Sequence, residues 1–222
     1  MVTTREIVLF IPSLLLSLSV HEFMHAWVAT KLGDPTPVKE GRLTLSPLAH
    51  IDPLGTVLFP GLAVFSALAL HAPLMFFGWA KPVRFNPSLF TKKLTGWQGT
   101  AIAAVVGPLS NLALAILAAL LVRAMIQTNH VNEMVLTFCD VMIQLNVLLF
   151  LFNLLPLPPL DGGRLIPPTM ESVHDFLSRY SFLIFIVLFF LPIGSHGAIG
   201  WRVLGPVLQF LHMNVMKLTG AY

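Results

Sequence analysis

Five long apolar runs constrain the fold of this chain more than any other feature. They cover residues 7–30, 54–77, 101–126, 141–160 and 180–193, and a weaker amphipathic stretch follows at 199–218. About 20 apolar residues suffice for a helix to cross a bilayer. Only 10% of the 222 residues are charged, whereas soluble proteins carry about a quarter. We therefore expect an all-α polytopic membrane protein with five to six hydrophobic helices.

This composition also sets the expected domain organisation and location. The apolar runs leave no segment large enough for a separate soluble domain, so residues 1–222 are expected to form a single multi-pass domain in the cell membrane. The core helices are expected at about 7–30, 101–126 and 141–160. The formal net charge of +3 is attributed to basic loops at the membrane surface rather than to nucleic-acid binding, and the lipid bilayer is the expected partner.

Basic residues follow each of the first two apolar runs. Lys31, Lys39 and Arg42 follow the first run, and four more Lys or Arg residues follow the second. Segment 127–140 contains no Lys or Arg. Basic loops favour the cytoplasmic side of a membrane, but a single crossing by 54–77 would separate these two loops. We therefore expect 54–77 to be re-entrant or otherwise not to change sides, with the N-terminus outside.

The pentapeptide His21-Glu22-Phe23-Met24-His25 lies inside the first apolar run. Helical spacing places the two histidines one turn apart on one face, where both rings can reach a single metal ion. Glu22 lies beside them. This is the pattern of a zinc hydrolase, in which the metal holds a water molecule and the glutamate takes its proton. Ionisable residues within a membrane span are costly and usually serve a function, although a buried polar helix contact would give the same pattern.

A catalytic zinc site usually needs a third protein ligand. The best candidate is Asp161, because the apolar helix before it runs into prolines and the acidic residue precedes two glycines, in the segment NLLPLPPLDGG at 153–163. Proline breaks the helix and lets the chain turn a carboxylate toward a neighbour. On its own the segment would be an ordinary turn. A membrane zincin with Glu133 or Glu171 as third ligand is the alternative enzyme.

Together, the HEFMH and NLLPLPPLDGG segments resemble the site-2 protease family of intramembrane zinc metalloproteases. The resemblance extends to GDPTP at 33–37, GRLTLSPLAHIDPLG at 41–55, GWAKPVRFNP at 78–87 and GPLSN at 107–111, as in the small branch without a PDZ domain. It implies one Zn²⁺ held by His21, His25 and Asp161, with Glu22 as catalytic base. It also implies a role for Asn153 in substrate or oxyanion binding. The implied function is hydrolysis of peptide bonds in membrane-anchored proteins.

Other expectations concern the surroundings of this site and a different class of protein. Residues 38–45 alternate in polarity, as in a short strand of a hairpin-like loop that could pair with unwound substrate. Gly107 is assigned mainly to helix packing, Asp52 to capping the next helix, and His71 to an interior or interfacial position. The alternative function is a metal-binding or transport protein without peptidase activity.

Overall fold

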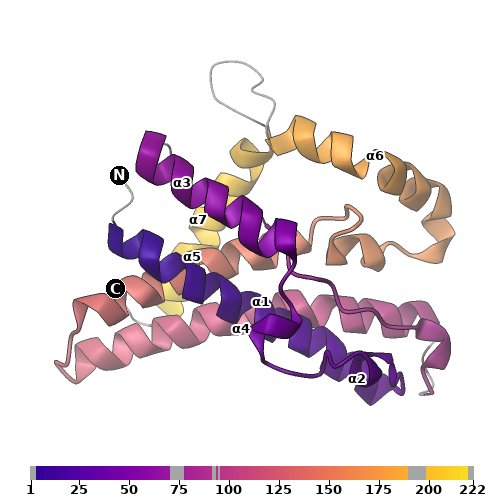
Figure 1. Ribbon diagram of the computed structural model, residues 1–222, viewed down its shortest axis with the longest axis horizontal. Helices are drawn as coiled ribbons and strands as arrows, with labels where there is room; N and C mark the ends of the chain where they lie inside the picture. Colours follow the sequence, from indigo (N-terminus) through magenta and orange to yellow (C-terminus); the bar gives the residue numbers. More distant parts are fainter. Residues whose placement is uncertain (1–3, 71–77, 92–93, 95, 190–198, 220–222) are drawn as a thin grey trace.

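The computed structural model describes residues 4–70, 78–91, 94, 96–189 and 199–219 (Figure 1). These residues are helical or irregular, and none of them belongs to a strand. The α-helices are α1 (Thr4–Leu32), α2 (Thr36–Lys39), α3 (Phe59–Leu70), α4 (Gly96–Gln127), α5 (Glu133–Asn153), α6 (Glu171–Phe189) and α7 (Ile199–Thr219). The short 3-10 or π-helical turns are η1 (Pro47–Ala49), η2 (Pro53–Leu58), η3 (Pro87–Leu89), η4 (Asp161–Leu165) and η5 (Pro168–Met170).

Helices α1, α4 and α5 are long and apolar enough to cross a membrane. They contain 29, 32 and 21 residues, and they confirm the expectation of hydrophobic helices near 7–30 and 101–126. The run at 141–160 gave the wrong limits for α5. This helix begins earlier because the Asn132 side chain accepts hydrogen bonds from the amides of Met134 and Val135, and it ends at Asn153, before the prolines.

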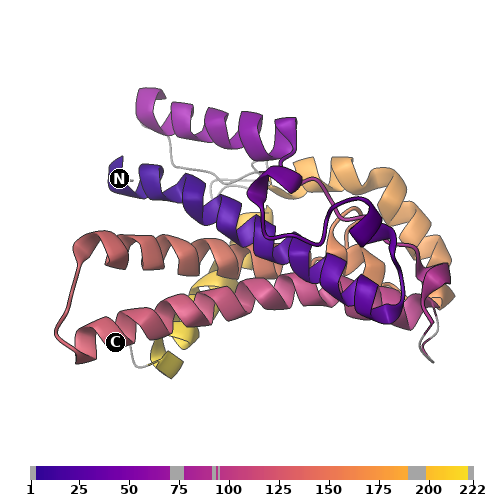
Figure 2. The same ribbon diagram turned by 60° about the horizontal axis from the view of Figure 1, so that its bottom comes forward.

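The three long helices pack side by side, with α4 running antiparallel to α1 and α5 (Figure 2). Arg5 and Glu133, at the beginnings of α1 and α5, form an exposed ion pair at 2.9 Å. Two clusters of buried apolar side chains fill the bundle. One joins α1 to α5 and the other joins α4 and α5 to α7. The first contains Phe10, Leu14, Leu18, Ala80 and Leu145; the second contains Ala115, Ala118, Ala119, Val122, Cys139, Met142, Ile143, Val147, Val215 and Met216.

The described part of the second apolar run forms η2 and α3, and the chain that resumes after it contacts the start of the run. The Trp79 amide donates to the Gly55 carbonyl at 3.2 Å, and the Thr56 hydroxyl donates to the Trp79 carbonyl at 2.8 Å. The 12-residue α3 is shorter than the roughly 20 residues of a span. These contacts agree with a segment that does not change sides, although residues 71–77, and His71 with them, lie outside the described part.

The two basic loops are in direct contact at one end of the bundle. The Asn86 amide donates to the buried Asp34 carboxylate at 2.6 Å, and the Thr91 amide donates to the Leu32 carbonyl at 2.9 Å. This contact agrees with the prediction that both loops share a side of the membrane. Their assignment to the cytoplasm stays a prediction.

The strand expected at 38–45 is wrong. Val38 and Lys39 complete the short helix α2, whose first turn begins where Asp34 accepts a hydrogen bond from the Thr36 amide. The chain then turns, since the Arg42 amide donates to the Pro37 carbonyl at 2.8 Å. Local capping outweighs the alternating polarity here, because a short strand without a partner has nothing to stabilise it.

Candidate metal centre

The first half of the site comes from the middle of α1. His21 and His25 lie one turn apart and are both buried, and their rings meet edge to face with centroids 4.6 Å apart. Their Nε2 atoms approach to 3.0 Å. Residues Ala26 and Ala29 of α1 and Ala103 of α4 are fully buried, so small side chains bring the two helices close at this level.

Asp161 reaches the histidines from a tight turn after α5. Its Oδ2 lies 3.1 Å from each of the two Nε2 atoms. The glycines that follow make this turn feasible: a Cβ on Gly162 would lie 2.2 Å from the Leu155 carbonyl oxygen, and one on Gly163 would lie 2.7 Å from the Pro158 nitrogen.

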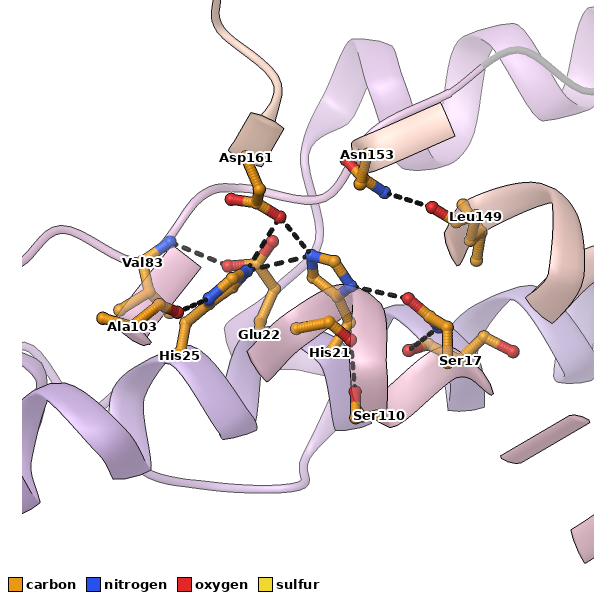
Figure 3. Close-up of polar contacts among 12 residues, drawn as sticks. Ser17, His21, Glu22, His25, Val83, Ala103, Ser110, Leu149, Asn153 and Asp161 are labelled. Carbon is orange, nitrogen blue, oxygen red and sulfur yellow. Dashed lines mark hydrogen bonds and ion pairs between the residues drawn. The ribbon is translucent and has the colours of Figure 1, made fainter. Parts of the chain in front are cut away.

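The outward nitrogens of both imidazoles are occupied by acceptors. His21 Nδ1 lies 2.6 Å from Asn111 Oδ1, and His25 Nδ1 lies 2.6 Å from the Ala103 carbonyl oxygen. Oxygen atoms of this kind only accept, so each Nδ1 donates a proton. In the neutral imidazole the lone pair is then on Nε2. Two lone pairs and a carboxylate oxygen therefore face one point (Figure 3).

This donor set fits a zinc ion. Three donors at mutual distances of 3.0–3.1 Å are close to the separation of about 3.3 Å expected between ligands in a tetrahedral zinc site. Gly107 of α4 keeps the adjacent space free: a Cβ there would lie 2.3 Å from His25 Nε2 and 2.8 Å from His21 Nε2. Two unprotonated imidazole nitrogens this close repel each other unless a cation or proton lies between them.

Glu22 lies beside the cluster, with one carboxylate oxygen fixed by the backbone. Its Oε2 accepts a hydrogen bond from the buried Val83 amide at 2.8 Å. Figure 3 shows the carboxylate next to Asp161 and His25. The second oxygen remains available for proton transfer, which suits a general base more than a fourth ligand.

The remaining sequence candidates bond to groups outside the cluster or are exposed. Asn153 donates from Nδ2 to the Leu149 carbonyl of its own helix at 3.0 Å (Figure 3). Glu133 pairs with Arg5 and Glu171 is exposed at the beginning of α6. The expected cap is confirmed, since Asp52 Oδ1 accepts from the amides of Leu54 and Gly55.

Several residues at the site were missed or misread from the sequence. Gly107 contacts the metal-facing nitrogens rather than only packing helices. Val83 and Ser17 carried no signal in the sequence, because each is linked to the site by a contact over more than 60 positions or through another side chain. A buried asparagine in an apolar helix was the one available hint for Asn146.

Comparisons with known proteins agree with this geometry. The family model described as "Peptidase family M50" matches residues 9–192. "Putative zinc metalloprotease YwhC" of Bacillus subtilis is 39% identical over 94% of this chain and 90% of its own length. "Putative zinc metalloprotease Rip2" of Mycolicibacterium smegmatis is 32% identical over 83% of this chain and 68% of its own. No solved structure gives a significant match.

The matched range contains both histidines, Glu22 and Asp161. The cluster of two imidazoles and one carboxylate is a site that could hold a metal ion, and three helices in the described part of the chain are apolar enough to span a membrane. These observations and the comparisons have a common conclusion: the chain is an integral membrane protein and belongs to peptidase family M50, the site-2 protease family of zinc metalloproteases.

Proposed function

We propose that this protein is an intramembrane zinc endopeptidase that hydrolyses peptide bonds of membrane-anchored proteins. The observation that carries the proposal is the convergence of His21, His25 and Asp161 within 3.1 Å of one another, with the Glu22 carboxylate beside them. This is the constellation of a metallopeptidase, in which ligands, base and an open position for water lie together.

The depth of the cluster supports cleavage within the bilayer. His25 and His21 lie 7 and 11 residues before Leu32, the last residue of α1. At a rise of ~1.5 Å per residue they lie roughly 10–16 Å along the helix from its end. A peptide bond that reaches this site therefore comes from a segment held at the membrane.

His21, His25 and Asp161 would hold the zinc, and the remaining chemistry is assigned to nearby residues. When bound, the ion would supply a Lewis acid that polarises the peptide carbonyl and makes water more acidic. Glu22 accepts the proton of the attacking water on its second oxygen and returns it to the leaving amine. Val83 keeps the first oxygen in place during this transfer.

Asn153 is the proposed contact for the substrate carbonyl or its oxyanion. It is the last residue of α5, shortly before the turn that delivers Asp161. Its Nδ2 bonds the Leu149 carbonyl, so a contact with substrate would exchange that bond for a new one. Asn153→Ala should lower the cleavage rate with zinc content unchanged, as expected of a donor that acts in the transition state.

The decisive experiment replaces Glu22 by Gln. The variant is expected to bind zinc like the wild type, measured by elemental analysis of the protein in detergent, and to lose cleavage. Cleavage is measured by comparing the N-termini in membrane proteomes of cells that express either form. Asp161→Ala should lose both zinc and cleavage.

The alternative of a metal-binding or transport protein gives a different outcome. If identical membrane fragments accumulate with wild-type and Glu22→Gln protein, the peptidase proposal is wrong. If the wild type fails to bind zinc and cleavage survives Asp161→Ala, the assigned ligands are wrong.

A further inference from the structure

A chain of buried polar side chains lies behind His21, away from the donor cluster. It contains Asn111 of α4, Asn146 of α5 and Ser17 of α1, all fully buried, so that one residue comes from each of the three candidate spans. Buried polar groups of this kind are costly in an apolar bundle unless they are fully hydrogen-bonded. Nothing in the proposed mechanism uses Asn146 or Ser17.

The orientation of Asn146 is fixed by a partner that can only accept. Its Nδ2 donates to the Met142 carbonyl of its own helix at 2.8 Å and to Ser17 Oγ at 2.8 Å. Ser17 donates its own hydroxyl proton to the Ser13 carbonyl at 2.7 Å, so its oxygen is an acceptor for Asn146. The amide nitrogen of Asn146 therefore faces these two groups, and its oxygen faces the other way.

The orientation of Asn146 determines that of Asn111, and Asn111 determines the proton position on His21. Asn146 Oδ1 accepts from Asn111 Nδ2 at 2.9 Å, and the same nitrogen has a longer contact of 3.4 Å with the Ser17 carbonyl. Asn111 Oδ1 is thereby directed to His21 Nδ1 at 2.6 Å. Since an amide oxygen only accepts, Nδ1 carries the proton and the Nε2 lone pair faces the cluster.

We infer that Asn146 is a positioning residue that acts on the metal site through Asn111, although it touches neither the cluster nor His21. This inference rests on the proposed zinc site. Hydrogen bonds to the outer nitrogen of a metal-binding histidine fix its tautomer and ring orientation, and losing one typically costs about 10- to 100-fold in metal affinity. Here the donor and acceptor orientation is set at the Met142 carbonyl of α5, and the side-chain amides of Asn146 and Asn111 pass it on to His21 of α1.

The test measures zinc affinity of metal-free protein in detergent by competition with a chromophoric chelator. Asn111→Leu is expected to weaken zinc binding by about 10- to 100-fold. Asn146→Leu is expected to weaken it by about tenfold, because the Ser17 carbonyl still contacts Asn111. Ser13→Ala is the matched control, since its buried hydroxyl bonds only the Leu9 carbonyl.

A double variant separates positioning from a general loss of packing. In the Asn111→Leu background, Asn146→Leu should cause no further loss of zinc affinity, because its route to His21 is already broken. Its effects on the melting temperature should instead persist.

Should Asn146→Leu fail to fold, Asn146→Ser takes its place. Its single hydroxyl proton can replace one of the two donations to Met142 and Ser17, while the shorter side chain withdraws the amide oxygen from Asn111. The inference is overturned if the folded Asn146 variant binds zinc like the wild type, or if the two substitutions reduce zinc affinity additively. A wild type that binds no zinc would instead refute the proposed function, so the two failures are distinguishable.

Discussion

Two walls of the metal centre hold the two histidines by different means. On one side the α4 backbone does so: the Ala103 carbonyl bonds His25 Nδ1 and Gly107 leaves room at Nε2. On the other side, side-chain amides hold His21: Asn111 bonds its ring and is itself bonded by Asn146. A backbone carbonyl survives any substitution, whereas an amide side chain does not. The two histidines should therefore differ in their sensitivity to mutation.

The largest effect is expected where the backbone wall has no side chain. Gly107→Ala would place a methyl group 2.3 Å from His25 Nε2, in the space that the donors face. We expect zinc affinity to fall by about 100-fold or more, measured by chelator competition. Gly205→Ala is the matched control, because a Cβ there meets nothing within 4 Å. Retention of zinc by a folded Gly107→Ala protein would contradict the geometry.

The next effect concerns the catalytic base rather than the ligands. Val83→Pro removes the amide that holds Glu22 Oε2 and should lower kcat/KM by about 10- to 100-fold, because small misplacements of a reacting group cost this much. Zinc content should not change. Arg84→Pro is the control, as that exposed neighbour does not contact Glu22. Equal activity of the two proline variants would show that the Val83 bond is dispensable.

A substitution that leaves the backbone wall intact should spare the metal. Ala103→Gly keeps the carbonyl that bonds His25, so zinc affinity is expected to stay within about twofold of the wild type. Stability should fall by about 1 kcal/mol, because glycine is unfavourable inside a helix. Thermal unfolding measures the stability, and chelator competition measures the zinc affinity. A large loss of zinc here, comparable to that in Asn111→Leu, would remove the distinction between the two walls.

The smallest effect on the site is expected at the other end of the bundle. Asn132→Ala removes the cap of α5 and should cost about 1 kcal/mol of stability, with zinc binding and cleavage unchanged below the melting temperature. Circular dichroism during heating measures the loss. Changed zinc affinity in this variant would mean that the whole of α5, and not Asn146 alone, adjusts the site.

Local patterns in the sequence predicted much of the fold and the cluster. The spacing of His21 and His25 brings the two rings together if 7–30 is helical. The prolines and glycines around Asp161 predict that the helix ends before it. Apolar runs likewise predicted α1 and α4. These features depend on neighbours in the chain, so sequence reasoning reaches them.

The errors arose where distant contacts or short-range capping decide the outcome. Asn146 and Val83 serve the site only because helices from opposite parts of the sequence meet. The strand expected at 38–45 failed because the chain forms the short helix α2 there, next to the hydrogen bond from the Thr36 amide to Asp34. Helix α5 begins early because Asn132 caps it. The cap at Asn132 could have been read from the sequence; the route from Asn146 to His21 could not.

The hydrogen bonds from Trp79 to Gly55 and from Thr56 to Trp79 hold the two ends of the second apolar run together at one place. The length of the run between these two ends could therefore change without moving the helices that follow it to the other face of the bilayer. The metal centre and the second apolar run can thus vary independently, because the metal centre is constrained by its chemistry and the run by its surroundings.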